Sequence, residues 1–224
     1  MRSGDAIVLF NGDGFFYHGT LNFDAKTDCS VEISNAMLAN SESPLAITLL
    51  QGLASSEKMA WAIEKATELG VHTVIPVECH RSVAQISAEK AEKKQFHWLN
   101  IARAASAQCG RATVPTIATA ISSCNSLQFN PHTSDHDALL VLSPVSSKPL
   151  SGWASKIRQT ASGETPTPLR IAVYIGPEGG LDEEELSFAL GQGFQAIRVG
   201  PRVLRTETAG PTVIASLQAL LGDF

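Results

Sequence analysis

Three apolar segments of this chain end in a small residue followed by proline. They end at Ser143-Pro144, Gly176-Pro177 and Gly200-Pro201. In an open α/β sheet, ligands bind beyond the carboxyl ends of the strands. The small residue leaves room for a ligand, and the proline fixes the backbone beside it. A strand-terminating turn explains any one of these ends, but the three together predict the rim of a pocket.

The second of these ends continues as the glycine-rich loop Gly176–Gly180. This loop lacks the Lys-Ser/Thr pair of a phosphate loop and the glycine spacing of a dinucleotide-binding turn. Glu178 and the acidic run Asp182–Glu185 would also repel a phosphate at the start of the following helix. For the acidic run, ordinary helix-start charge is the favoured explanation. The loop therefore fits a neutral or cationic ligand better than a phosphate.

The third end leads into the segment Arg202–Ala209. Together with the glycine-rich loop, this segment resembles the signature of the ribosomal RNA uridine-N3 methyltransferase family of the SPOUT superfamily. The resemblance extends from about residue 3 to the C-terminus. The other matching positions are Lys58, Glu64–Gly70, Arg81–Val83 and Gln108–Arg111.

The resemblance implies an α/β fold with two domains. Residues 43–224 are expected to form a SPOUT-type parallel sheet with a C-terminal trefoil knot near residues 170–215. Residues 1–42 are expected to be a partial, apparently truncated PUA-like β-barrel domain that helps to hold RNA. The family binds S-adenosylmethionine in the knot, works as a homodimer, and methylates N3 of a uridine in the 16S rRNA of the small ribosomal subunit. We therefore expect a cytoplasmic, S-adenosylmethionine-dependent rRNA methyltransferase.

The resemblance also assigns roles to individual residues. A sulfonium cation without phosphate suits the acidic loop described above. Glu207 is the candidate base that removes the N3 proton, and Arg205 is the candidate stabiliser of the developing uridinate charge. The alternative for both is structural, as partners of each other or caps of the last helix. The residues expected to bind the cofactor are Leu142, Ser143, Gly176, Pro177, Glu178, Gly179, Val199, Gly200, Pro201, Val203, Leu204 and Thr206.

RNA contact must come from local patches of charge. The chain has 17 Lys and Arg against 22 Asp and Glu, a net charge of −5, which excludes a partner bound by bulk positive charge. Solvated helix faces explain the lysines of Lys90–Lys94 equally well. The residues expected to contact RNA are Lys58, Arg81, Arg103, Gln108, Arg111 and Arg202, with Arg81, Arg103 and Arg111 expected on phosphates.

Neither a metal nor a membrane is expected as a partner. The four cysteines lack the spacing of a zinc site and indicate reduced cytosolic thiols. The segment His132–Asp137 resembles a metal site, but it is expected to lie in a loop with no further ligand nearby. No apolar run approaches the ~20 residues of a membrane span, and the N-terminus has no apolar signal region.

The elements that must position these residues follow from hydrophobic periodicity. Residues 1–40 are typical of β structure, with a hairpin turn at Asn11–Gly14. Strands then alternate with helices, which predicts a parallel sheet covered on both faces. The composition of Ser146–Pro168 indicates a surface loop with at most a short helix.

Two helix starts are predicted from capping and proline rules. Asp182 followed by Glu185 predicts a capping box. Because proline is tolerated only in a first turn, Pro211 predicts that the last helix begins near Thr212.

Two alternatives to uridine-N3 methylation stay open. One is a SPOUT methyltransferase with another target, a ribose 2′-hydroxyl or a different RNA. The other is a non-catalytic ribosome-assembly protein that binds S-adenosylmethionine or RNA, for which the short N-terminal segment argues.

Overall fold

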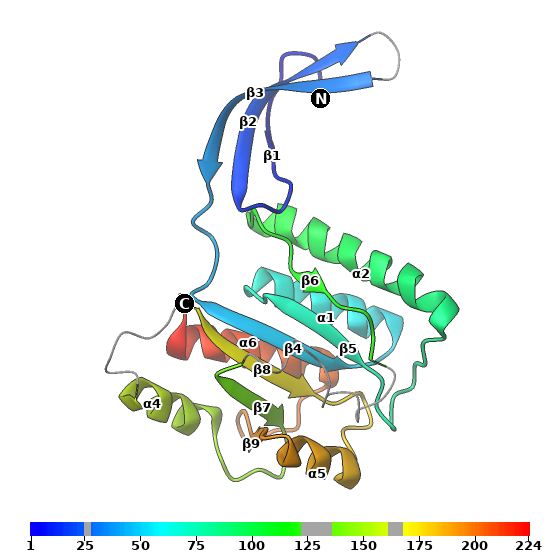
Figure 1. Cartoon of the computed structure of the whole chain (residues 1–224), viewed down its shortest axis with the longest axis vertical. Coiled ribbons are helices and arrows are strands. Elements are labelled where there is room, and N and C mark those ends of the chain that lie inside the picture. Colours follow the sequence, from blue (N-terminus) through cyan, green and yellow to red (C-terminus); the bar gives the residue numbers. More distant parts are fainter. Residues whose placement is uncertain (25–27, 122–135, 161–167) are drawn as a thin grey trace. The chain divides into compact units, whose positions relative to one another are not determined.

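The computed structural model describes residues 1–24, 28–121, 136–160 and 168–224 (Figure 1). These residues form two compact units. The first consists of residues 1–42 and 106–114, and the second of residues 43–105 and 115–224. The segment 106–114, which the expected boundary after residue 42 leaves in the second domain, therefore packs with the first unit.

The first unit contains a three-stranded antiparallel sheet with the strand order β1-β2-β3. The predicted hairpin turn lies between β1 and β2, where Gly12 and Gly14 have φ angles of 95° and 90°. These left-handed conformations favour glycine. The strands are β1 (Ala6–Leu9), β2 (Phe15–Asp24) and β3 (Asp28–Leu38).

An ion pair joins the two chain segments of this unit. The Arg111 guanidinium donates from Nη2 to Glu42 Oε2 at 2.7 Å and from Nε to Glu42 Oε1 at 3.2 Å. Only 6% of the Arg111 side chain is exposed. This two-point geometry is the strong form of an arginine–carboxylate pair, and it fixes the segment 106–114 to the end of the N-terminal strands.

The second unit is built on a six-stranded sheet with the order β6-β5-β4-β8-β7-β9, in which every pairing is parallel. The predicted parallel α/β sheet is thus confirmed. Within the described residues, no helix has the length and apolar character to cross a bilayer. The strands are β4 (Leu45–Gly52), β5 (Thr73–Val77), β6 (Thr116–Ile117), β7 (Ala138–Leu142), β8 (Leu169–Ile175) and β9 (Gln195–Ile197). The helices are α1 (Ser56–Glu68), α2 (Ala88–Cys109), α4 (Leu150–Thr160), α5 (Glu183–Gly191) and α6 (Thr206–Leu221).

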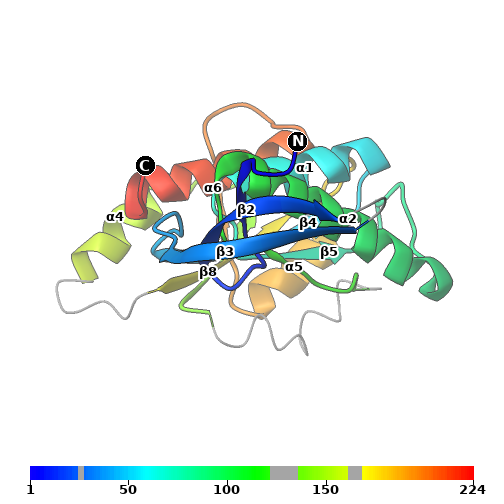
Figure 2. The same ribbon diagram turned by 90° about the horizontal axis from the view of Figure 1, so that it is seen from above.

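The central strands are buried on both faces. Figure 2 shows α1 and α6 on one face of the sheet and α5 on the other. On the α6 face, Leu49 of β4 packs against Gly210. On the α5 face, Leu50 and Tyr174 share a core cluster with Ala189 of α5. Two-sided burial explains why β4 and β8 are predominantly apolar rather than alternating.

Helix α6 begins well before the predicted start. It runs from Thr206 with Pro211 inside it, so the prediction of a start near Thr212 is wrong. Pro211 has no N–H to donate to the helix. Tertiary packing compensates, because Ala209 and Gly210 are buried and Gly210 lies against β4. Helix α4 occupies eleven residues of the segment Ser146–Pro168, for which the composition predicts a surface loop with at most a short helix.

We expect the substitution Glu42→Gln to loosen the first unit selectively. Removing the carboxylate leaves a buried guanidinium without its charged partner, which costs about 1–3 kcal/mol. Hydrogen exchange should show faster exchange in β2, β3 and 106–114, with β4 and β8 unchanged. Glu32→Gln, an exposed change on β3, is the matched control. Unchanged exchange in Glu42→Gln would show that the pair contributes nothing to the unit.

Candidate functional site

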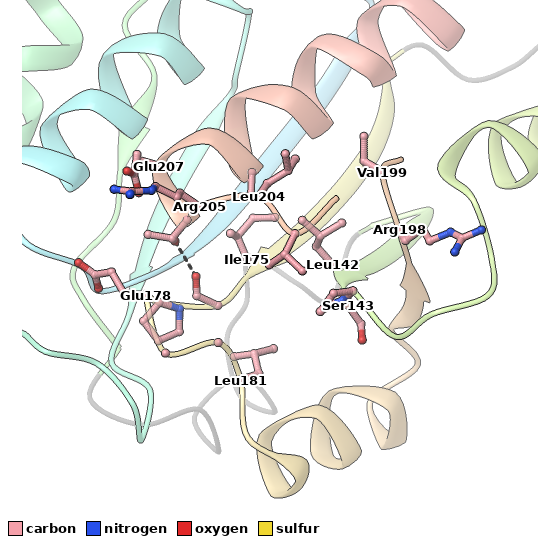
Figure 3. Close-up of a pocket in the computed structure, with 18 of the residues that line it drawn as sticks. Leu142, Ser143, Ile175, Glu178, Leu181, Arg198, Val199, Leu204, Arg205 and Glu207 are labelled. Atoms are coloured by element: carbon pink, nitrogen blue, oxygen red, sulfur yellow. Dashed lines mark hydrogen bonds between the residues drawn. The ribbon is translucent and has the colours of Figure 1, made fainter. Parts of the chain in front are cut away.

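A cavity of about 560 Å³ lies at the carboxyl ends of β7, β8 and β9. This volume is in the range of about 300–1,000 Å³ that small-molecule sites occupy. Figure 3 shows Ser143 and Arg198 on one side of the cavity and Glu178, Arg205 and Glu207 on the other. The three proline-terminated strand ends therefore meet around one space, as the sequence predicts.

Most of the predicted site residues lie around this cavity. All the residues expected to bind the cofactor line it, and so do Arg205 and Glu207. Lys58, Arg81 and Arg202 also line it, whereas the remaining expected RNA contacts do not. Three apolar lining residues belong to no motif in the sequence, namely Ile175, Leu181 and Leu186. Ile175 ends β8, Leu181 follows the glycine-rich loop, and Leu186 lies on α5.

The glycine-rich loop is packed too closely for side chains at two positions. A Cβ on Gly176 would lie 2.8 Å from the Leu181 nitrogen, and a Cβ on Gly179 would lie 2.8 Å from Arg81 Cβ. Gly180 has a φ of 69°, and its N–H donates to the Pro177 carbonyl at 2.9 Å. The loop therefore forms one wall of the cavity with its backbone.

Glu178 fastens this loop to the start of α1. Its Oε1 accepts a hydrogen bond from the Ser55 N–H at 3.0 Å and one from Lys58 Nζ at 3.3 Å. Partial burial raises the pKa of Glu178, but these hydrogen bonds outweigh it and the net pKa lies below the ordinary value. Glu178 is thus an ionised carboxylate whose charge is already balanced by Lys58. Lys58, an expected RNA contact, thus contacts the glycine-rich loop, and its contact with RNA stays a prediction.

The turn after β5 holds the loop from a second direction. Arg81 Nη1 donates to the Gly179 carbonyl at 3.2 Å. The His80 N–H donates to Glu185 Oε1 at 2.7 Å, and His80 Nδ1 lies 2.6 Å from Asp182 Oδ2. The predicted capping box of α5 is confirmed, with Asp182 and Glu185 each accepting from the other's backbone N–H. These contacts join β5, the loop and α5 into one edge of the cavity.

His80 and Asp182 shift each other's titration. The hydrogen bond with Asp182 and the nearby Glu185 charge raise the pKa of His80 above 6.5. Hydrogen bonds from the Glu185 backbone and from His80 lower the pKa of Asp182 below 3.8. Candidate ligand atoms of His80, Asp182 and Glu185 lie within 4.8 Å of one another. The hydrogen bonds just described already account for all three groups, so we assign no metal there.

Of the two histidines in the segment that resembles a metal site, His136 has a hydrogen-bond partner. His136 Nε2 lies 2.9 Å from Thr48 Oγ1 on β4. His132 lies outside the described residues.

The start of α6 brings the catalytic candidates to the cavity. Glu207 Oε2 is buried and has no hydrogen-bond partner among the described residues. Arg205 is the N-cap residue, but its exposed side chain makes no capping hydrogen bond. Between them, Thr206 Oγ1 donates to the Gly176 carbonyl at 2.6 Å (dashed line in Figure 3). In the part of the chain that the structure describes, Arg205 and Glu207 form no ion pair with each other.

Three expected RNA contacts are not among the residues that line the cavity. Arg103 is exposed on α2 and donates to Asn100 Oδ1 at 3.2 Å. Gln108 is exposed near the end of the same helix. The Arg111 guanidinium is buried and paired with Glu42, a geometry that does not favour the predicted phosphate contact.

Comparison with known proteins gives consistent matches along the chain. A sequence model of the RNA methyltransferase domain matches residues 41–218. The ribosomal RNA small subunit methyltransferase E of Bacillus subtilis is 33% identical over 211 residues, which covers 93% of this chain and 79% of that protein.

Two solved structures are similar over the full chain. One is a ribosomal RNA small subunit methyltransferase E from Neisseria gonorrhoeae bound to S-adenosylmethionine, with a TM-score of 0.84 and 33% identity. The other is a Legionella pneumophila protein in complex with the same cofactor, with a TM-score of 0.86 and 34% identity. Each match covers 100% of this chain and 86% of the other.

We expect the His80–Asp182 contact to stabilise the protein in a defined pH window. Because the contact raises the pKa of His80, its contribution to the free energy of unfolding is complete below pH 6.5. This contribution is lost as the pH rises through the raised pKa. Because the contact lowers the pKa of Asp182, its contribution to the free energy of unfolding is also complete above pH 3.8. This contribution is lost as the pH falls through the lowered pKa. The melting temperature of His80→Gln should therefore fall furthest below that of the wild type between these two pH values.

The matched control for this pH series is His97→Gln, an exposed histidine on α2. Its melting temperature should follow the wild type at every pH. A deficit in His80→Gln that stays constant up to alkaline pH would contradict the assignment.

Proposed function

This chain belongs to the RNA methyltransferase family whose domain spans residues 41–218, and from that premise we propose that it methylates N3 of a uridine in small-subunit ribosomal RNA. The methyl donor is S-adenosylmethionine, the ligand of two similar structures. The relatives named above act on ribosomal RNA of the small subunit. The proposal adds the target atom and the roles of individual residues.

The observation that carries this proposal is the state of the Glu207 carboxylate. A buried polar atom without a partner is rare in folded proteins and calls for an explanation. Glu207 Oε2 is such an atom, and Glu207 lines the cavity. A uridine N3–H brought into the cavity is a donor that this oxygen can accept from. We therefore assign Glu207 as the base.

The cavity suits the cofactor chemically. When bound, S-adenosylmethionine supplies an activated methyl group on a sulfonium. The backbone wall of Gly176–Gly180 offers close approach, and the Glu178 charge is balanced by Lys58 rather than free to bind a cation. The loop therefore holds its ligand by shape and backbone polar groups. The apolar side chains of Leu142 and Ile175 complete the lining.

The chain's own part in the reaction is orientation and proton removal. Glu207 takes the N3 proton, which leaves the electron pair on N3 to form the new bond to the methyl carbon while the carbon–sulfur bond breaks. Arg205 stabilises the negative charge that develops on the uracil oxygens. Because the methyl donor is already activated, alignment of these groups supplies much of the rate.

The proposal extends to RNA contact and assembly. Arg198, Arg202 and Arg205 form an exposed basic rim of the cavity, suited to RNA phosphates. As in the family that the sequence resembles, we propose a cytoplasmic homodimer with a knot near residues 170–215 and an RNA-binding, PUA-like N-terminal domain.

The direct test uses small ribosomal subunits from cells that lack the gene. Incubation with the chain and S-adenosylmethionine should produce N3-methyluridine at one position, detected by mass mapping of the rRNA. Cofactor binding alone should raise the melting temperature. A 2′-O-methyl mark would establish the alternative target. Cofactor binding without any mark would favour the assembly-protein alternative.

We expect Glu207→Gln to lower single-turnover methylation by about 10²–10⁴-fold, the usual size of a general-base contribution. Cofactor affinity should stay near the wild-type value. Alkaline pH should partly rescue the variant, because uridine then ionises without help. Glu57→Gln, an exposed acid on α1, is the matched control. Full activity in Glu207→Gln would remove this residue from the reaction.

A further inference from the structure

A buried glutamine beside the cavity belongs to none of the motifs discussed so far. Gln51 lies near the end of β4 and is 1% exposed. Its Nε2 donates to Thr206 Oγ1 at 2.8 Å and to the Gly52 carbonyl at 3.1 Å. Thr206 Oγ1 donates in turn to the Gly176 carbonyl at 2.6 Å. These two hydrogen bonds, from Gln51 to Thr206 and from Thr206 to Gly176, are called the Gln51–Thr206–Gly176 relay below.

The direction of the relay is fixed by chemistry. A hydroxyl has one proton, and the Gly176 carbonyl can only accept. The Thr206 proton must therefore point at Gly176, so Thr206 accepts its other hydrogen bond from Gln51 Nε2. This orientation leaves Gln51 Oε1 buried without a partner among the described residues. The unpartnered oxygen lowers the stability of the folded protein, and this loss accompanies the hydrogen bond from Nε2 to Thr206.

Among the described residues, Thr206 carries the side-chain hydrogen bonds that join the first turn of α6 to the sheet. The N-cap residue of this helix, Arg205, makes no side-chain capping bond, and Pro211 removes one backbone donor from the early turns. Gly210 lies directly over the amide, since a Cβ there would come within 3.2 Å of Gln51 Oε1. The placement of this helix start therefore depends on Gln51.

The helix start is also where the proposed catalytic groups are attached. Arg205 and Glu207 flank Thr206 in the sequence, and both line the cavity. Gly176 begins the glycine-rich wall, and its own position is set by β8 in the centre of the sheet. The relay thus ties the catalytic segment to the cofactor wall through one threonine hydroxyl.

We infer that Gln51 is a positioning residue for methyl transfer, acting through Thr206 to hold Arg205 and Glu207 in register with the cofactor wall. The inference rests on the function proposed above. Misplacement of reacting groups by about 1 Å costs on the order of 10²-fold in rate. The effect should fall on the chemical step, because the cofactor wall keeps its own contacts through Glu178 and Arg81.

The test compares Gln51→Leu and Thr206→Val, which remove the relay with little change in side-chain volume. Each should lower single-turnover methylation by about 10–100-fold while the dissociation constant for S-adenosylmethionine changes less than about threefold. The double variant should be no slower than the slower single variant, because both changes break one connection. Thr206→Ser restores the hydroxyl and should recover most of the rate lost in Thr206→Val.

The matched control is Thr48→Val on the same strand. Thr48 is 4% exposed and its hydroxyl contacts His136, so this variant also loses a buried hydrogen bond, but away from the cavity. It should lose stability and keep its rate. Alkaline pH should rescue the relay variants less than it rescues Glu207→Gln, because these variants misplace Arg205 as well as the base. Rates within threefold of the wild type in Gln51→Leu and Thr206→Val would overturn the inference, as would a rate loss equal to that of Thr48→Val.

Hydrogen exchange separates failure of the inference from failure of the proposed function. Amides 206–210 should exchange faster in Gln51→Leu and Thr206→Val than in the wild type or in Thr48→Val, whether or not any RNA is methylated. If the wild type modifies no uridine, the proposed reaction fails while this positioning contact stands. If exchange at these amides is unchanged, Gln51 does not hold the helix start and the inference fails.

Discussion

Parallel strands carry all their carboxyl ends to the same edge of the sheet, and this constraint decides where the polar side chains of the protein meet. The connections that leave β4, β5, β7, β8 and β9 all begin at that edge. Three of these strand ends surround the cavity, and the connections after β4 and β5 supply Lys58 and Arg81 to its wall. The same crowding requires glycine at Gly176 and Gly179, where a side chain would collide with neighbouring residues. The backbone geometry of the parallel sheet thus determines where the residues that line the cavity lie.

Glu178 has a different role in the structure from the one that its charge suggests in the sequence. Glu178 suggests a counter-charge for a cationic ligand, yet Lys58 and the Ser55 N–H already satisfy it. The acidic residues Asp182 and Glu185, by contrast, act as the sequence predicts, because they cap their own helix, and they also hold the turn at His80. Among the described residues that line the cavity, Glu207 Oε2 is buried without a hydrogen-bond partner. Hydrogen bonds and ion pairs within the wall thus satisfy Glu178, Asp182 and Glu185, but not this oxygen.

Local sequence signals predicted the features that depend on local physics. The hairpin turn at Asn11–Gly14, the alternation of strands and helices and the capping box at Asp182 follow from turn chemistry, hydrophobic period and short-range hydrogen bonding. Features that depend on distant partners were missed. Pro211 alone argues against a long α6, and only packing against β4 shows why the helix persists. Gln51 carries no motif, because its role exists only when β4, β8 and α6 are assembled.

The first unit is completed by residues that are synthesised much later than its strands. Glu42 and Arg111 are separated by the whole stretch 43–105, which belongs to the other unit. At about 5–20 residues per second, a ribosome needs roughly 3–13 s to make that stretch. During this time the N-terminal strands lack the ion pair between Glu42 and Arg111. Apolar side chains such as Phe23 and Ile33 are exposed even in the finished fold. The first unit is therefore complete only after the end of α2 has been made, and until then the unpaired strand edges favour edge-to-edge aggregation.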